Sequence, residues 1–306
     1  TFNIPQGVVA DNSGNIFIAD TENHVIRKID ANGIVSTFAG LAGSSDVTDG
    51  EGNIARFNKP FSLAIDSSQN IYVADTYNHN VRKITPQGYV TTIAGKAGPP
   101  GDTDGQGTEA RFNYPYGIAI DNNDNIFVSD FNHLIRKITP DYNVTTYAGI
   151  SGQTGNDDGS GLSAKFNKPI ALAIDNLGNL FVAELENHII RKITPDANVT
   201  TFAGIAGNSG NNNGAKNVAL FNQPIGLAID HSNNLYVSEQ GNQLIRRIDS
   251  KGNVTTFAGK LSVTGDDNGV GDNSTFNYPV GLAFGSSNNL YVADSENKII
   301  RKIVIG

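Results

Sequence analysis

A four-residue pattern, Phe-Asn-x-Pro, recurs along the chain at a nearly constant interval. Its phenylalanines are Phe2, Phe57, Phe112, Phe166, Phe221 and Phe276, so successive copies begin 55, 55, 54, 55 and 55 residues apart. Periods of this length are typical of repeat architectures, in which each unit buries its apolar surface against its neighbours. We therefore predict one domain over residues 1–306, built from six repeats (1–55, 56–110, 111–164, 165–219, 220–274 and 275–306).

Each repeat contains short apolar runs separated by Gly, Asn, Asp, Ser and Pro, which favour tight turns. The fifth repeat shows four runs, over residues 226–230, 234–239, 244–248 and 253–259. No segment has a helical period, and the second run is apolar at nearly every position, as expected of a strand covered on both faces. The pattern predicts an all-β, six-bladed β-propeller of antiparallel sheets, with four strands in each of the first five blades and negligible helix.

The sixth repeat departs from the others. It stops at residues 302–306 without the Val-Thr-Thr-Phe-Ala-Gly run that ends the preceding repeats. We therefore predict a three-stranded last blade with an exposed edge. Two ways of closing the ring stay open: either the missing strand lies upstream in a longer parent protein, or blades one and six are joined only by side-chain packing.

The amino-acid sequence of the repeat resembles that of the NHL-repeat family over essentially the whole chain. The resemblance is carried by Asp20-Thr-Glu-Asn-His24, Asp75-Thr-Tyr-Asn-His79 and Glu184-Leu-Glu-Asn-His188, each with an Arg-Lys pair shortly after it. It implies a six-bladed propeller. It also implies a protein of a kind used mainly to bind protein, glycan or RNA, with a few enzymatic relatives such as the amidating lyase and the lactonase-like propellers.

Composition removes several classes of function. The net charge is -8 and the chain has no Cys, Met or Trp. Phosphate backbones need clustered excess cations, so a nucleic acid is not expected as partner, and disulfide and thiol chemistry are excluded. The chain has no apolar run of 18 residues, so no membrane span is predicted. Because Thr1 opens directly into the repeat, we expect a processed chain or part of a longer multidomain one, with an extracytoplasmic or secreted location.

Residues that recur in every blade are interpreted as structural. His24, His79, His133 and His188 share one repeat position. Strand spacing puts that position on the order of 14 Å from a six-fold axis, and neighbouring copies about 14 Å apart. Zinc ligands lie near 2 Å from one metal, so we predict no metal site there. An acid ends each second run six or seven residues before an arginine, which predicts a cross-strand ion pair rather than a catalytic acid.

The five loops between repeats are rich in Asp, Asn and Gly. They span residues 46–52, 102–107, 156–161, 211–214 and 266–271. Oxygen ligands suit calcium, but none of these loops completes the spacing of a calcium-binding loop. Compact loops stabilised by Asx turns are the favoured interpretation, with calcium as the alternative and no other cofactor expected.

A ligand breaks six-fold symmetry, so positions that differ between repeats are the candidates for binding. The third residue of Phe-Asn-x-Pro and the residue after its proline both vary, and both are expected near the axis, at the end of the propeller that bears the long loops. Aromatic faces with a few polar groups are typical of a binding site. The predicted ligand-binding residues are Lys59, Phe61, Tyr114, Tyr116, Lys168 and Tyr278. The alternative is that these side chains only plug the mouth of the channel.

Three functions are compatible with this sequence. The favoured one is a non-enzymatic recognition or scaffold propeller that binds a protein segment or glycan at the loop-bearing face. The second is a metal-dependent hydrolase or lyase of the lactonase-like or amidating-lyase-like type. It is disfavoured because the inner runs, such as residues 226–229, carry no acid before their terminal Asp. The third is a structural module of a longer surface protein. No catalytic residue is assigned.

Overall fold

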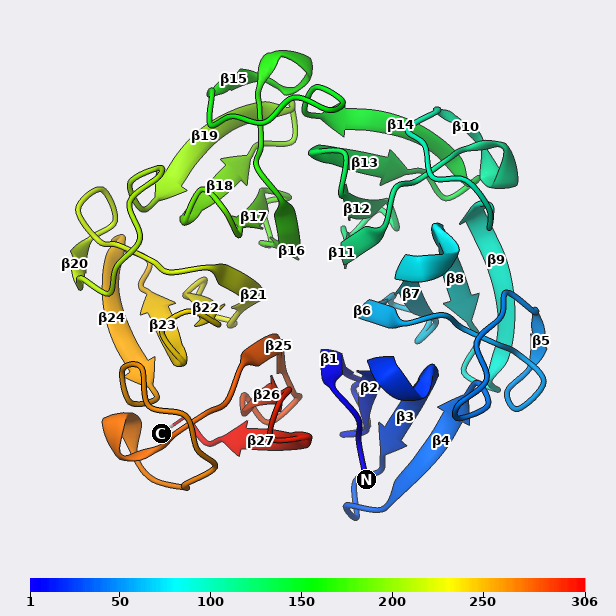
Figure 1. Ribbon diagram of the computed structural model, residues 1–306, viewed down its shortest axis with the longest axis horizontal. Helices are drawn as coiled ribbons and strands as arrows, with labels where there is room; N and C mark the ends of the chain where they lie inside the picture. The colour runs from blue at the N-terminus through cyan, green and yellow to red at the C-terminus, as the bar shows by residue number, and fades with distance from the viewer. Residues whose placement is uncertain (306) are drawn as a thin grey trace.

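The computed structural model describes residues 1–305 and shows six antiparallel sheets arranged around a central axis (Figure 1). Blade 1 contains β1 (Pro5–Ala10), β2 (Ile16–Asp20), β3 (Val25–Ile29) and β4 (Val35–Ala39). Blade 2 contains β6 (Pro60–Ile65), β7 (Ile71–Asp75), β8 (Asn80–Ile84) and β9 (Tyr89–Gly95). Blade 3 contains β11 (Pro115–Ile120), β12 (Ile126–Asp130), β13 (Leu134–Ile138) and β14 (Asn143–Ala148).

The remaining blades repeat this order from the axis outward. Blade 4 contains β16 (Pro169–Ile174), β17 (Leu180–Glu184), β18 (Ile189–Ile193) and β19 (Asn198–Ala203). Blade 5 contains β21 (Pro224–Ile229), β22 (Leu235–Glu239), β23 (Leu244–Ile248) and β24 (Asn253–Ala258). Blade 6 contains β25 (Pro279–Phe284), β26 (Leu290–Asp294) and β27 (Ile299–Ile303), which confirms the three-stranded last blade.

Four further strands of two residues each add a fifth, outermost strand to the sheet of a blade. They are β5 (Gly50–Glu51), β10 (Gly105–Gln106), β15 (Gly159–Ser160) and β20 (Gly214–Ala215). Each belongs to a loop between blades and pairs with the start of the outer strand of the next blade, as β5 pairs with Tyr89 and Val90. Blades 2 to 5 therefore have five strands rather than the predicted four, because the Asp- and Gly-rich loops turn back onto the sheets.

Within residues 1–305, helix is confined to five 3₁₀ turns of three residues. They are η1 (Thr21–Asn23), η2 (Thr76–Asn78), η3 (Gly107–Glu109), η4 (Gly161–Ser163) and η5 (Gly271–Asn273). The first two lie between the second and third strands of their blades, and the others lie in loops between blades. The prediction of an all-β chain with negligible helix is confirmed.

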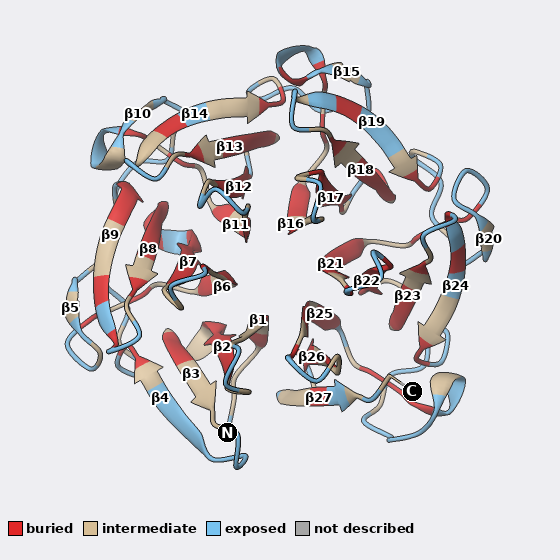
Figure 2. Cartoon of the chain, turned by 180° about the vertical axis from the view of Figure 1, so that it is seen from behind, coloured by how far each residue is buried: buried red, intermediate tan, exposed pale blue. Residues whose placement is uncertain are grey.

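Burial follows the predicted order of strands. The second strands of blades 1 to 5 are buried at all five positions, whereas the outer strands carry exposed residues (Figure 2). Apolar clusters join each blade to the next, as where Phe181 and Ala183 of blade 4 pack with Leu227 and Val237 of blade 5. The core is thus divided among the interfaces between blades, as expected of radial repetition.

The acid that ends each second strand forms the predicted ion pair with the arginine of the third strand. The paired oxygen and nitrogen atoms lie 3.3, 2.9, 3.6, 2.7, 3.1 and 2.9 Å apart in blades 1 to 6. In blade 4, Arg191 also donates hydrogen bonds to the carbonyl oxygens of Asp157 and Lys165. Its guanidinium lies 5.2 Å from the ring centroid of Phe166. The recurrent Phe, acid and Arg therefore anchor the long loop to the sheet.

Blades 1 and 6 close the ring through the same contact that joins other blades. Ser295 Oγ of blade 6 donates a hydrogen bond of 2.7 Å to the carbonyl oxygen of Pro5, as Thr21 Oγ1 does to that of Pro60. Val8 and Ile18 pack with Ala283 at the same junction. Within the described residues, blades 1 and 6 share no sheet. They are joined by side-chain packing and by the hydrogen bond of Ser295, which is the second of the two ways of closure that the sequence left open.

Replacing Ser295 by alanine should lower the free energy of unfolding by about 1–2 kcal/mol, because the buried carbonyl oxygen of Pro5 loses its donor. Guanidinium denaturation monitored by circular dichroism measures the change. Ser287→Ala in the exposed turn between β25 and β26 is the control and should be neutral. Equal stability of the two variants would show that this contact does not contribute to closure.

Candidate functional site

The turn that enters each inner strand has an unusual backbone conformation. The x residue of Phe-Asn-x-Pro has a positive φ in all six repeats, between 47° and 62°, although none of the six is glycine. This left-handed conformation is uncommon for non-glycine residues. A constant backbone therefore presents a side chain that differs from blade to blade. The variation is visible in the sequence, whereas the left-handed conformation of these non-glycine residues is not.

The repeated histidines hold these turns in place. His24 Nδ1 accepts a hydrogen bond of 3.1 Å from the backbone N–H of Lys59 in the next blade. His79, His133 and His188 accept in the same way from Tyr114, Lys168 and Gln223. In blade 5 the amide oxygen of Gln243 accepts from Tyr278 at 2.6 Å. Each histidine therefore acts at a separate blade junction, in agreement with a structural role.

Burial lowers the pKa of all four turn histidines below the usual value of 6.5. The neutral imidazole is also the form that can accept a hydrogen bond at Nδ1. Both effects favour an uncharged ring in the folded protein. At neutral pH the histidines are therefore uncharged, and their hydrogen bonds hold the entry turns at the loop-bearing end.

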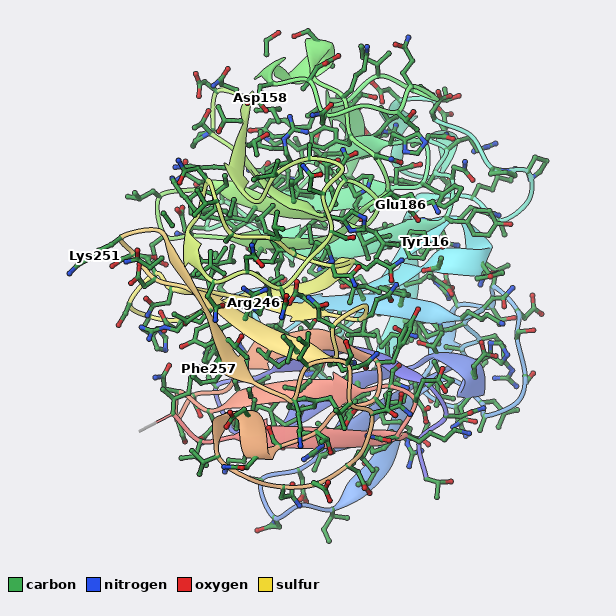
Figure 3. All side chains as sticks on the ribbon, turned by 60° about the vertical axis from the view of Figure 1, so that its left-hand side comes forward. Tyr116, Asp158, Glu186, Arg246, Lys251 and Phe257 are labelled. Carbon is green, nitrogen blue, oxygen red and sulfur yellow. The ribbon has the colours of Figure 1, made fainter. Side chains whose placement is uncertain are left out.

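The mouth of the channel at the loop-bearing end contains a cavity of about 270 Å³, referred to below as the mouth pocket. Its lining residues are Gln6, Phe61, Tyr116, Phe131, Lys168, Ile170, Leu185, Ile225, Gln240 and Tyr278. Lys168 pairs with Glu186. Figure 3 shows Tyr116 and Glu186 on the same side of the molecule, and Lys251, in the turn between β23 and β24, on the opposite side. The structure brings together Phe61, Tyr116, Lys168 and Tyr278 of the six predicted residues.

Two predicted residues lie outside the lining of the mouth pocket. Lys59 Nζ forms a 2.8 Å ion pair with Glu22. The ring of Tyr114 packs against Tyr77 at 5.2 Å and against Phe131 at 6.2 Å between centroids. Tyr114 therefore supports the pocket residue Phe131, whereas Lys59 is held by the neighbouring turn.

The walls and floor of the mouth pocket are largely apolar. Phe61 and Tyr116 form an edge-to-face pair with centroids 5.0 Å apart, and they pack on a buried cluster of Ile170, Ile225 and Val280. These side chains follow the proline of their repeats, as predicted for residues at the mouth. The same side chains pack together and line the pocket, so a binding site and a plug of the channel mouth stay open as alternatives.

Two amide oxygens at the mouth pocket are buried without a partner. Gln6 Oε1 and Gln240 Oε1 accept no hydrogen bond within residues 1–305, and the Gln240 side chain is held only by a 3.4 Å contact to Gln223. An unsatisfied buried acceptor is costly. Gln6 stands where the other blades have aromatic or aliphatic residues, and it was not among the predicted site residues. Gln240 was missed.

The polar groups of the mouth pocket carry little net charge. Lys168 Nζ is paired with Glu186 at 3.0 Å. Burial raises the pKa of Tyr116 and of Tyr278, so both phenols keep their protons at neutral pH. Among the described residues, the lining contains no carboxylate and no histidine. The pocket can hold an apolar or aromatic group and accept hydrogen bonds from it.

The Asp- and Asn-rich loops use part of their oxygen atoms within the fold. Asp49 Oδ1 lies 2.7 Å from Arg82, and Asp104 Oδ1 lies 2.7 Å from Arg136. Asp158 pairs with Arg191 in the same way at 2.8 Å. These carboxylates bind the arginines of the blade, and calcium binding by the loops stays a prediction.

Comparisons with known proteins agree with this architecture. A family model described as the NHL repeat matches residues 2–29, 57–84 and 276–303. The chain is 31% identical over 280 residues to NHL repeat-containing protein 2 of Homo sapiens, and the match covers 80% of this chain and 38% of that protein. The chain thus spans less than half the length of this curated relative.

Solved structures show the same fold at low identity. An auxiliary nutrient binding protein from Bacteroides thetaiotaomicron has a TM-score of 0.74 with 16% identity, over 99% of this chain and 69% of that one. A streptogramin B lyase has a TM-score of 0.63 with 16% identity, over 98% of this chain and 93% of that one. The fold thus occurs in both binding proteins and enzymes. In residues 1–305, no helix is long and apolar enough to cross a membrane.

Proposed function

The chain belongs to the family of NHL-repeat six-bladed β-propellers, and from that premise we propose that it is a non-enzymatic recognition module that binds a protein segment or glycan at the mouth pocket. The observation that carries the proposal is the pair of unpartnered amide oxygens, Gln6 Oε1 and Gln240 Oε1, beside the aromatic walls. Buried polar groups without partners are expected at functional sites, where a ligand satisfies them.

The pocket defines the chemistry of its ligand. Two unpartnered acceptors suit a ligand that donates hydrogen bonds once the buried amides turn into the pocket, and the apolar walls formed by Phe61 and Tyr116 suit an apolar or ring surface beside the donors. A protein side chain with N–H groups and a sugar with hydroxyl groups both meet this description. Within residues 1–305, the lining contains no carboxylate and no histidine, and its one lysine is held in an ion pair with Glu186, which supports recognition over catalysis that depends on proton transfer.

Binding to immobilised peptides and glycans tests the proposal. We expect the purified chain to retain a subset of these ligands, and Tyr116→Ala to weaken the retained binding by about 1–3 kcal/mol, as is usual for a buried aromatic contact. Tyr278→Ala should have the same direction of effect, because its side chain is part of the lining. Neither variant should change the melting temperature by more than a few degrees.

A matched pair of controls separates binding from folding. Phe166→Ala removes a fully buried ring that packs on Arg191, so it should lower the melting temperature and affect binding only through unfolding. Lys251→Ala on the opposite side should change neither property. The proposal is wrong if binding survives both tyrosine substitutions and is abolished by substitutions on the side of Lys251.

A further inference from the structure

Asn80 breaks the symmetry of the blades in the interior of the fold. It opens β8, directly across from Asp75. The equivalent positions in the other five blades are apolar, and they are Val25, Leu134, Ile189, Leu244 and Ile299. Asn80 is 0% exposed, and neither its Nδ2 nor its Oδ1 has a hydrogen-bond partner within residues 1–305. Its amide therefore costs stability that an apolar residue would not.

Asn80 lines a groove of about 650 Å³ that is separate from the mouth pocket. The other residues of this groove are Val47, Thr92, Gly95, Lys96, Ala97, Thr108, Glu109 and Arg111. They come from the end of β9 and from the loops on either side of blade 2. We refer to it as the Asn80 groove.

The loop beside the Asn80 groove also departs from its counterparts. The loops that lead to Phe57, Phe166, Phe221 and Phe276 each form one parallel bridge to that phenylalanine. The loop that leads to Phe112 carries Pro99-Pro100 and forms no such bridge within the described residues. Two independent irregularities of the repeat, the buried amide and the proline loop, therefore lie at the same groove.

We propose that the Asn80 groove is a second binding site, which takes an extended peptide segment of a protein partner with an acidic side chain. A primary amide offers one donor and one acceptor side by side, and a peptide group offers the complementary pair. Lys96 and Arg111 line the groove against the single carboxylate of Glu109, so its local charge is positive in a chain with a net charge of -8. This balance favours an acidic segment.

Access to the amide requires a local movement. Because Asn80 is fully covered, a peptide reaches it only when part of the groove lining shifts. Lys96, Pro99 and Pro100 are exposed, and Gly98 has a φ of 126°. The loop can therefore move without breaking a blade.

The test uses N-acetylaspartate N-methylamide as probe, titrated into ¹⁵N-labelled protein. We expect saturable shifts of the Asn80 side-chain amide and of the backbone amides of Gly95 and Lys96. Asn80→Leu, which installs the residue of the equivalent position in blade 3, should weaken binding at least tenfold and raise the melting temperature. Lys96→Ala should leave the melting temperature unchanged. It should weaken binding of this probe more than it weakens binding of the neutral analogue, N-acetylasparagine N-methylamide.

Two results would overturn the proposal: shifts that persist in Asn80→Leu, or a melting temperature that falls in that variant, which would indicate a structural asparagine. A crystal of the wild-type chain soaked with the probe gives a second readout. If that crystal shows only an ordered water on the Asn80 amide, and no probe, the proposal is also contradicted. Tyr116→Ala should leave probe binding to the groove unchanged. This variant separates failure of the Asn80 groove from failure of the mouth pocket.

Discussion

Replacing Arg191 by leucine should lower the free energy of unfolding by about 3–5 kcal/mol, because the substitution leaves a buried carboxylate without its partner. Arg191 is 0% exposed, and its Nη1 lies 2.7 Å from Glu184 Oε1. The same guanidinium holds the carbonyl oxygens of Lys165 and Asp157 in the connecting loop. Loss of the side chain thus removes an anchor of the loop and isolates a charge. Chemical denaturation of the purified variant measures the loss.

The double variant Glu184→Gln/Arg191→Leu identifies the cause. Glutamine removes the stranded charge, while its amide oxygen can still accept from the backbone N–H of Asn167. Part of the lost stability should therefore return in the double variant. Lys192→Ala, on the next residue of β18, should have little effect because Lys192 is only half-buried. If Arg191→Leu costs no more than Lys192→Ala, the ion pairs do not stabilise the blades.

The second large effect is a loss of stability in acid that is caused by the turn histidines. Burial lowers their pKa in the folded protein below the value of 6.5 expected when unfolded. The unfolded chain therefore binds more protons below pH 6.5. Their contribution to stability is complete above that pH and is lost as the pH falls through the folded pKa, by up to about 1.4 kcal/mol per pH unit for each histidine. Denaturation midpoints between pH 7.5 and 5 measure this loss.

The chain itself supplies the control for this prediction. Gln243 takes the place of the histidine in blade 5 and accepts the same hydrogen bond. Replacing His24, His79, His133 and His188 by glutamine should therefore keep the contacts and remove their pH dependence. Burial raises the pKa of Asp75 to about 6 and that of Glu184 to about 7. These acids stabilise the fold as the pH falls, so only the difference between the two proteins isolates the histidines. Identical pH dependence in both would contradict the prediction.

Much of the fold could be predicted from the sequence because each blade repeats the same local solution. The spacing of Phe-Asn-x-Pro predicts six blades, and the interval between the acid and the arginine predicts that they are cross-strand neighbours, as the ion pairs confirm. The two-residue strands such as β5 were missed because their pairing depends on where the loop returns in space. A two-residue segment such as Gly50–Glu51 has no pattern of its own.

The candidate site was predicted only in part. Symmetry breaking directed attention to the mouth, where Phe61 and Tyr116 meet. The sequence did not show that Lys59 pairs with Glu22, because this acid lies in the neighbouring blade and is distant in sequence. Unsatisfied hydrogen bonds, which identify Gln240 and Asn80, cannot be read from a sequence. Asn80 nevertheless gave a readable signal, because it is the one polar residue among the six at its repeat position.

A crystal structure of the chain with a peptide or glycan retained in the binding assay tests the central claim most directly. The account predicts ligand density in the mouth pocket, with an apolar or ring surface against Phe61 and Tyr116. It also predicts a ligand donor within about 3 Å of Gln6 Oε1 or Gln240 Oε1. Density confined to the side of the molecule that carries Lys251, with both glutamine oxygens still unpartnered, would contradict the account.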